Sequence, residues 1–209
     1  MNPTVIVLAK RPRPGRVKTR LCPPCSDEEA ARIAAAALEL TIASALRSTA
    51  SRLVLACDED VTVPGFETIR QRGEGLGERL TNAFADVGGP AVLVGMDTPQ
   101  LTPRLIDEAL EVIVDGGSVI GPTQDGGYWG IGLPGESRQD PFARVPMSRA
   151  DTFEHQIARL RLLGHEPKVL PELRDVDVFA DARAVARLVP ESSFAELVLA
   201  VDDRIRSVA

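Results

Sequence analysis

Three uninterrupted apolar segments constrain the fold of this chain more than any other feature. They cover residues 5–9, 53–57 and 91–95, and in none of them do apolar and polar side chains alternate. Such runs are typical of strands that are buried on both faces, as in a parallel sheet. Helical patterns separate the three runs, so the sequence predicts an α/β fold with right-handed crossovers between parallel strands.

Several predicted helices begin with a recognisable cap. Ser26 and Glu29 form the pattern of a capping box before an alanine-rich, strongly helix-forming segment. Ser193 and Glu196 are expected to cap a helix at the C-terminus in the same way. The other elements expected are helices over residues 76–87, from 102 onwards and over 151–163, and strands over 119–120, 128–133 and 168–170.

The length and charge of the chain limit its organisation and its partners. Its 209 residues contain no linker and no internal repeat, which predicts a single domain over residues 1–209. No apolar run is long enough to span a membrane, and the N-terminus lacks the basic segment of a signal peptide, so a cytoplasmic location is expected. A formal net charge of −6 argues against nucleic acid or a membrane surface as a partner.

The cysteines allow a metal or redox site but do not favour one. Cys22 and Cys25 have the spacing of a ligand pair, yet no second such pair follows, and His155 and His165 lie far downstream. A tetrahedral zinc site needs four ligands. We therefore favour a proline-stiffened turn before the first helix over a zinc or redox function for this pair.

A basic segment at residues 10–20 stands out against the acidic average. It holds six lysine or arginine side chains and no acidic one, and it follows the first predicted strand directly. In open α/β sheets, ligands bind beyond the carboxyl ends of the strands. Because clustered cations repel one another, a bound di- or triphosphate is favoured over the alternative of a solvated basic turn. The segment has neither the glycines of a Walker loop nor a GxGxxG motif.

Acidic side chains follow two later segments. Asp97 comes directly after the third apolar run, which predicts that it lies at the same sheet edge as the basic segment. Asp175 and Asp177 would lie on one side of the chain if their segment is extended. Carboxylates so placed suit Mg²⁺ or Mn²⁺, which take oxygen ligands and bridge phosphates. The alternatives are capping roles for Asp97 and, in the last segment, for Asp181.

Two glycine-containing loops complete the set of candidate segments. Asp125 precedes a glycine pair and the only tyrosine and tryptophan of the chain, so its carboxylate is a candidate base or acceptor-binding group. A hairpin turn before a core strand is the alternative for this loop. Residues 71–76 lead into a predicted helix N-terminus, which is a natural contact for a phosphate or a base.

In this order the five segments resemble those of the GT-A, or nucleotide-diphospho-sugar transferase, superfamily. The resemblance runs from residue 4 to about residue 188 and is closest to a small bacterial family of arsenosugar-biosynthesis-type glycosyltransferases. The matching motifs are AKRPRPGRVKTRL at 9–21, GEGLGERL at 73–80, GMDTPQL at 95–101, GPTQDGGY at 121–128 and DVDVFAD at 175–181. The basic segment is also similar to that of phospholactate guanylyltransferases. The resemblance implies a three-layer αβα fold with a mixed, mainly parallel sheet.

The resemblance also implies roles for individual residues. Asp97 would be the central metal ligand and Asp177 the second, although Val178 replaces the threonine of the family motif. Asp97, Asp125 and Lys18 are the expected catalytic residues. The expected nucleotide-binding residues are Ala9, Lys10, Arg11, Gly15, Arg16, Lys18, Arg20, Gln71, Gly73, Gly75, Leu76 and Asp97.

Together these features predict a transferase that uses Mg²⁺ or Mn²⁺, a nucleotide-activated donor and a small-molecule acceptor. A nucleotide-diphospho-sugar glycosyltransferase is favoured because the nearest family carries that label. The alternatives are a guanylyltransferase-like nucleotidyltransferase acting on a phosphorylated small molecule, a nucleotide-binding protein without turnover, and a purely structural partner protein. The oligomeric state stays open, with a homodimer among the options.

Overall fold

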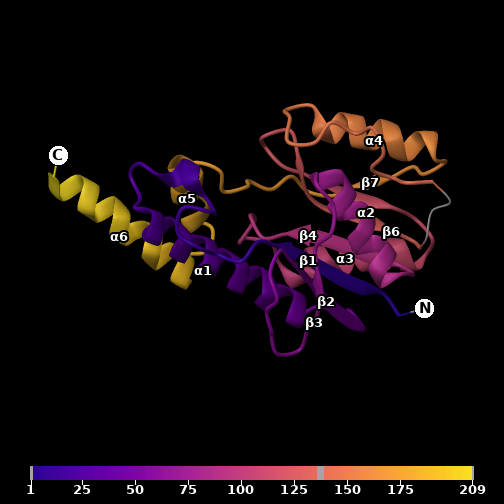
Figure 1. Cartoon of the computed structure of the whole chain (residues 1–209), viewed down its shortest axis with the longest axis horizontal. Coiled ribbons are helices and arrows are strands. Elements are labelled where there is room, and N and C mark those ends of the chain that lie inside the picture. The colour runs from indigo at the N-terminus through magenta and orange to yellow at the C-terminus, as the bar shows by residue number, and fades with distance from the viewer. Residues whose placement is uncertain (1, 136–138, 209) are drawn as a thin grey trace.

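The computed structural model describes residues 2–135 and 139–208, and a sheet of seven strands forms its centre (Figure 1). The strands are β1 (Thr4–Ala9), β2 (Arg52–Cys57), β3 (Glu67–Arg70), β4 (Ala91–Gly95), β5 (Val119–Pro122), β6 (Tyr128–Leu133) and β7 (Lys168–Val169). Their order across the sheet is β3-β2-β1-β4-β6-β5-β7. β6 runs antiparallel to both neighbours, and the other pairs are parallel. The predicted mixed, mainly parallel sheet is therefore confirmed, with the three apolar runs as β1, β2 and β4.

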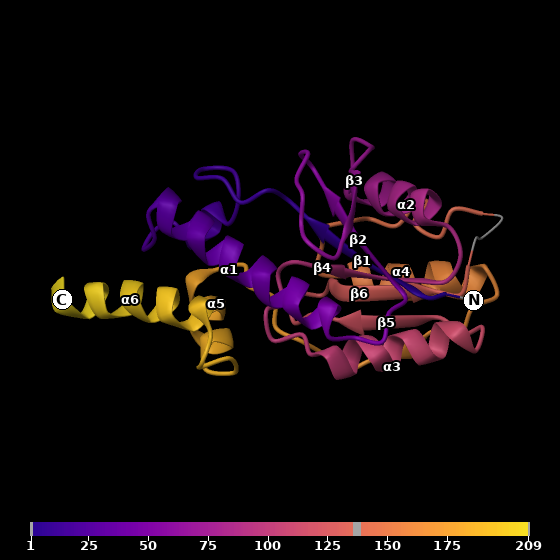
Figure 2. The ribbon, with the colours of Figure 1, turned by 90° about the horizontal axis from the view of Figure 1, so that it is seen from below.

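Helices cover both faces of this sheet (Figures 1 and 2). They are α1 (Asp27–Leu46), α2 (Leu76–Val87), α3 (Pro103–Val114) and α4 (Thr152–Leu162). α1 and α3 share an apolar core with the sheet face that presents Val7 and Val94. α2 and α4 share a second core with the opposite face, which presents Ile6 and Leu93. Alternate residues of β1 and β4 thus enter different cores, which explains why their sequences are apolar throughout.

A third apolar cluster lies beyond the end of the sheet. It joins α1 to α5 (Phe179–Ala186) and α6 (Ser193–Val208), and Leu21 and Phe194 are fully buried in it. Figure 2 shows α6 extending away from the sheet toward the C-terminus. No helix in the described part of the chain has both the length and the apolarity that a membrane span requires. Val176 belongs to the same cluster, so this lobe fixes the backbone between Asp175 and Asp177.

The predicted helix starts are confirmed with one correction. Ser26 Oγ accepts the N–H of Glu29 at 3.2 Å and a Glu29 carboxylate oxygen accepts the N–H of Ser26 at 2.8 Å, as expected for a capping box. The cap predicted for the last helix is wrong by one residue. The hydroxyl of Ser192, and not that of Ser193, accepts the N–H of Ala195 at 3.1 Å. The sequence favours Ser193 because Glu196 completes a capping-box pattern with it, whereas the backbone places Ser192 at the cap.

Two elements have no clear signal in the sequence. β3 is an edge strand with mostly exposed side chains, so it contains no apolar run. α5 has only eight residues and begins inside the acidic segment. Its third residue, Asp181, accepts the N–H of Val178 at 3.0 Å, which confirms the capping role considered for Asp181.

A bulge between β5 and β6 directs Trp129 into the core. The register shifts between Gly121 and Pro122, so β6 carries one residue more than β5 at this point. The Trp129 side chain is buried, and its indole N–H donates to the Pro171 carbonyl at 3.0 Å. Gly121 leaves room for the indole, because a Cβ there would lie 2.1 Å from Trp129 Cε2.

We predict that Gly121→Ala displaces the indole and destabilises the protein by about 1–3 kcal/mol through overpacking. Trp129 is the only tryptophan, so its fluorescence emission should shift to longer wavelength as it leaves its buried position. Urea unfolding followed by this emission measures both effects. Val169→Ala, an exposed change on neighbouring β7, serves as control and should stay within about 0.5 kcal/mol. An unchanged emission spectrum and midpoint in Gly121→Ala would contradict the packing described.

Candidate functional site

A cavity of about 740 Å³ opens at the carboxyl ends of β1 and β4. Because β6 is antiparallel to β4, its first residues reach the same edge and contribute to the wall. The charged side chains in the lining are Lys10, Arg16, Lys18, Arg20, Arg79, Arg149, Asp97, Asp125, Asp175 and Asp177. The cavity therefore lies where open α/β sheets bind their ligands, and it gathers charges from widely separated segments.

Two apolar anchors shape the basic segment around this cavity. Val17 packs into the core on the α1 and α3 side of the sheet, and Leu21 is buried in the C-terminal lobe. Between them the backbone of Lys18 is left-handed, with φ of 50°, and Thr19–Leu21 form one turn of 3₁₀ helix. The two anchors leave Lys18 and Arg20 in the cavity wall, directly after strand β1.

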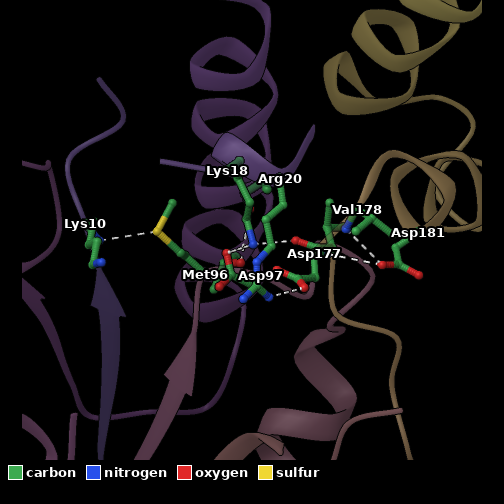
Figure 3. A network of polar contacts seen from close by, with 11 residues as sticks. Lys10, Lys18, Arg20, Met96, Asp97, Asp177, Val178 and Asp181 are labelled. Atoms are coloured by element: carbon green, nitrogen blue, oxygen red, sulfur yellow. Dashed lines mark hydrogen bonds and ion pairs between the residues drawn. The ribbon is translucent and has the colours of Figure 1, made fainter. Parts of the chain in front are cut away.

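Lys18 binds to two other segments of the site (Figure 3). Its ammonium group lies 2.7 Å from Asp97 Oδ1 and also donates to the carbonyl oxygen of Val176. The Lys18 side chain is only 12% exposed, so its charge depends on these partners. The backbone reinforces the contact, because the N–H of Val176 donates to the Asp97 carbonyl at 2.9 Å.

Arg20 makes the second ion pair of the site. Its Nη1 lies 2.7 Å from Asp177 Oδ2 (Figure 3), and the side chains of Arg20 and Asp177 are 73% and 43% exposed. Val178, which replaces the threonine of the family motif, directs its side chain outward and is 42% exposed. The N–H of Val178 is held by Asp181, so the backbone beside Asp177 is fixed without a threonine hydroxyl.

Asp125 also lines the cavity, and it lies in the turn between β5 and β6. Its Oδ1 accepts the hydroxyl of Thr123 at 2.6 Å and the N–H of Gly127 at 2.9 Å. These bonds orient the carboxylate within the cavity lining. The hairpin turn considered as the alternative for this loop is therefore present. It also holds Asp125 in the cavity lining, where the carboxylate can face a ligand.

Asp175 was considered together with Asp177 for the metal site, but only Asp177 was among the predicted site residues. Its pKa is raised to about 6, first by burial and next by the charge of Asp125, while Lys18 opposes the shift. Asp175 and Asp177 both line the cavity, whereas Val176 between them is buried. The alternation expected from the sequence, with both aspartates on one side of the chain, is therefore present.

Not every residue of the predicted nucleotide site lies in the cavity wall. Those that line it are Ala9, Lys10, Arg16, Lys18, Arg20, Gln71, Leu76 and Asp97. The structure places Arg11 against Glu59 at 3.3 Å, outside the lining. Gly15, Gly73 and Gly75 are likewise not among the described lining residues. Gly15 has φ of +70° and shapes the loop, so its glycine signal comes from backbone geometry.

Arg79 and Arg149 are two further cations that sequence reasoning missed. Arg79 extends from the first turn of α2, and Arg149 precedes α4 and is paired with Asp151. Neither residue lies in a charge cluster of the sequence. Only the packing of α2 and α4 on one sheet face brings them to the cavity.

The aspartates of the site fit a divalent cation that is shared with a phosphate. Among the described residues, no group of three or more His, Cys, Asp or Glu side chains could hold a metal by itself. Mg²⁺ commonly takes only one or two carboxylates and completes its shell with water and substrate phosphates. Asp97 and Asp177, on adjoining segments of the cavity wall, match that smaller requirement.

The surroundings of Cys22 and Cys25 disfavour their thiolate forms. Cys22, Cys25 and Cys57 are free thiols. Burial raises the pKa of Cys25 to about 11, and burial together with the Asp27 charge raises the pKa of Cys22. Raised pKa values disfavour the thiolate that would bind a metal or attack a disulfide. The interpretation of a structural turn before α1 is therefore favoured.

Comparison with known proteins supports the same assignment of fold and family. The family model described as "uncharacterized protein conserved in bacteria" (DUF2064) matches residues 28–149, more than half of the chain. None of the curated proteins matches the sequence significantly. A solved structure from Desulfovibrio desulfuricans G20, provisionally named a nucleotide-diphospho-sugar transferase, is similar over 99% of this chain and 97% of its own, with a TM-score of 0.87 and 26% identity.

More distant structures share the fold. CMP:2-keto-3-deoxy-manno-octonic acid synthetase in complex with CTP covers 91% of this chain and 99% of its own, with a TM-score of 0.58 and 13% identity. Rv0371c of Mycobacterium tuberculosis H37Rv in complex with manganese covers 89% and 98%, with a TM-score of 0.53 and 19% identity. The resemblance to the nucleotide-diphospho-sugar transferase superfamily, first seen in the motifs, is confirmed at the level of the fold.

We predict that Asp175→Asn stabilises the protein at neutral pH. A carboxyl whose pKa is raised on folding binds more protons in the folded state, so the stability of the wild type falls as pH rises from about 4 through about 6. Asparagine removes this loss. Because Asp175 is only half-buried, we expect a gain of about 1 kcal/mol at pH 8 and almost none at pH 4.

Urea unfolding in EDTA at both pH values measures the gain from Asp175→Asn. Asp115→Asn is the matched control, because Asp115 is exposed at the end of α3, far from the cavity. Equal effects of Asp175→Asn at pH 4 and pH 8 would show that Asp175 does not carry the expected penalty.

Proposed function

This chain belongs to the DUF2064 family, and we propose that it is a single-domain, Mg²⁺- or Mn²⁺-dependent transferase that binds a nucleotide-activated donor in the cavity. The favoured donor is a nucleotide-diphospho-sugar, and the acceptor is a small molecule with a nucleophilic hydroxyl. The name of the Desulfovibrio structure, the nearest of the three in TM-score and identity, supports this class of donor.

One observation carries the proposal: cations of the basic segment and carboxylates of two distant segments meet at one cavity. Lys18 contacts Asp97, and Arg20 contacts Asp177, with 2.7 Å in each pair. A metal–diphosphate complex needs both signs of charge in one place, since the metal takes carboxylates and the phosphates take cations. A solvated basic turn would not need acidic partners from segments some 80 and 160 residues away.

The cavity has cationic capacity beyond these two pairs. Lys10, Arg16 and Arg79 line it, and none of the three forms an ion pair with another described residue. Their charges are available to phosphate oxygens without the loss of an ion pair, although Arg79 Nε also donates to the Gly73 carbonyl at 3.2 Å. Over the whole chain the net charge is −6, so this local excess of positive charge favours an anionic ligand.

In glycosyl transfer the acceptor hydroxyl attacks the anomeric carbon, and the bond from that carbon to the diphosphate breaks. Asp125, oriented by Thr123 and Gly127, would accept the hydroxyl proton or align the hydroxyl. Lys18 and Arg16 would stabilise the charge that develops on the departing diphosphate. The divalent cation, held by Asp97 and Asp177, would add Lewis-acid stabilisation at the same oxygens.

Nucleotidyl transfer is the second candidate, and the unpaired cations favour it specifically. A nucleoside triphosphate carries more negative charge than a nucleotide sugar, and Lys10, Arg16 and Arg79 could neutralise the excess. In this reaction a phosphorylated acceptor attacks the α-phosphorus, and pyrophosphate leaves. Arg149, which lines the cavity and is paired with Asp151, is a candidate contact for the acceptor phosphate.

Two product assays separate the candidates. The protein is incubated with each nucleotide sugar or each nucleoside triphosphate, Mg²⁺ or Mn²⁺, and pools of sugar phosphates and hydroxyl acceptors. Release of nucleoside diphosphate would support glycosyl transfer. Acceptor-dependent release of pyrophosphate would instead identify nucleotidyl transfer as the reaction. Nucleotide binding with neither product after exhaustive acceptor screening would favour a binding protein without turnover.

We predict that Asp97→Asn lowers kcat by about 100-fold or more, because it removes the charge that holds the cation beside the leaving group. Nucleotide-dependent thermal stabilisation should also lose its dependence on Mn²⁺. Asp115→Asn makes the same chemical change at an exposed position near the opposite sheet edge and should keep wild-type rates. Near-normal turnover by folded Asp97→Asn would rule out the metal role.

A further inference from the structure

The ion pairs of the site create a conflict for a metal-dependent enzyme. The Lys18 ammonium lies on Asp97, and the Arg20 guanidinium lies on Asp177 (Figure 3). Asp97 and Asp177 are also the carboxylates proposed to hold the cation, and Lys18 and Arg20 are proposed to hold the phosphates. In the structure, each carboxylate proposed to bind the metal is therefore paired with a cation proposed to bind the donor phosphates.

We propose that these two ion pairs are the resting state of a partner exchange. This proposal rests on the proposed function. When the metal–donor complex enters, the donor phosphates take Lys18 and Arg20, and the released carboxylates of Asp97 and Asp177 take the divalent cation. The metal and the donor therefore bind together, and the metal alone binds weakly.

The burial of Lys18 explains why the metal alone cannot complete the exchange. A cation on Asp97 would repel the neighbouring ammonium and leave it with the Val176 carbonyl as its remaining hydrogen-bond partner among the described residues. The Lys18 side chain is 12% exposed, so water replaces the lost carboxylate poorly. Phosphate oxygens are the natural replacement for that carboxylate, because they also accept charge-assisted hydrogen bonds.

The donor without metal meets the opposite difficulty. Its phosphates would withdraw Lys18 and Arg20 and leave two carboxylates facing further negative charge. Lys10, Arg16 and Arg79 need no exchange, because they form no ion pair with described residues, and they can receive the phosphates first. The site thus contains three cations for initial binding and two that exchange partners.

The first test is the coupling between the two ligands in the wild-type protein. A panel of nucleoside diphosphates is titrated by calorimetry in EDTA and in saturating Mn²⁺, with Mn²⁺ alone followed by the electron paramagnetic resonance of the free ion. We expect Mn²⁺ to raise nucleotide affinity by roughly 5–150-fold. Equal nucleotide affinity with and without Mn²⁺ would overturn the exchange.

Variants distinguish partner exchange from ordinary metal–nucleotide binding. Lys18→Met and Arg20→Gln should each bind Mn²⁺ alone roughly fivefold more tightly than the wild type, because each frees a carboxylate, while they bind the metal–nucleotide complex less tightly. Arg20→Gln breaks only the exposed pair, so it carries the test if Lys18→Met does not fold. Arg13→Gln is the matched control, since Arg13 pairs with Glu59 outside the cavity lining.

The possible failures have separate signatures. If Mn²⁺ alone binds no more tightly to the folded variants than to the wild type, the exchange is wrong, and wild-type nucleotide binding still supports the proposed function. If the wild type binds no nucleotide of the panel with or without Mn²⁺, the proposed function and the exchange both fail.

Discussion

The contact of the Lys18 ammonium with the Asp97 carboxylate and the Val176 carbonyl joins the three parts on which the site depends. Lys18 belongs to the basic segment after β1, Asp97 follows β4, and Val176 belongs to the core of the C-terminal lobe. The N–H of Val176 returns to the Asp97 carbonyl, so backbone and side chain hold the same junction. The sheet edge and the lobe are therefore fixed relative to each other at the cavity wall.

The topology of the sheet explains why these charges meet. β1, β4 and β5 run in the same direction, so the segments that follow them emerge at one edge, and antiparallel β6 starts from that edge. Ligating groups on such turns do not interrupt the apolar strands, and the strands remain buried in both cores. Along these strands the apolar core residues and the charged residues of the site are thus separated.

The parts of this arrangement that could be predicted from the sequence are those encoded locally. Strands β1, β2 and β4 are apolar runs, and the position of Asp97 follows from the strand before it. Arg79 lies in the motif at 73–80 and Arg149 in none of the motifs, and both reach the cavity through the packing of α2 and α4. Arg11 is the opposite case: its place in the basic segment predicts contact with a ligand, but its side chain pairs with Glu59, 48 residues later.

Asp175 indicates that part of the cavity is arranged at the expense of stability. Its carboxyl is half-buried beside the like charge of Asp125, and neither burial nor that repulsion favours the folded state. By contrast, Lys18 and Arg20 have acidic partners even without a ligand. These pairs hold both cations in the cavity wall before a ligand arrives, and the proposed exchange then replaces their partners. The ion pairs of Lys18 and Arg20 stabilise the cavity in the absence of a ligand. The charges of Lys10, Arg16 and Arg79, which form no ion pair with described residues, and the charge of Asp175 are compensated only when a ligand binds.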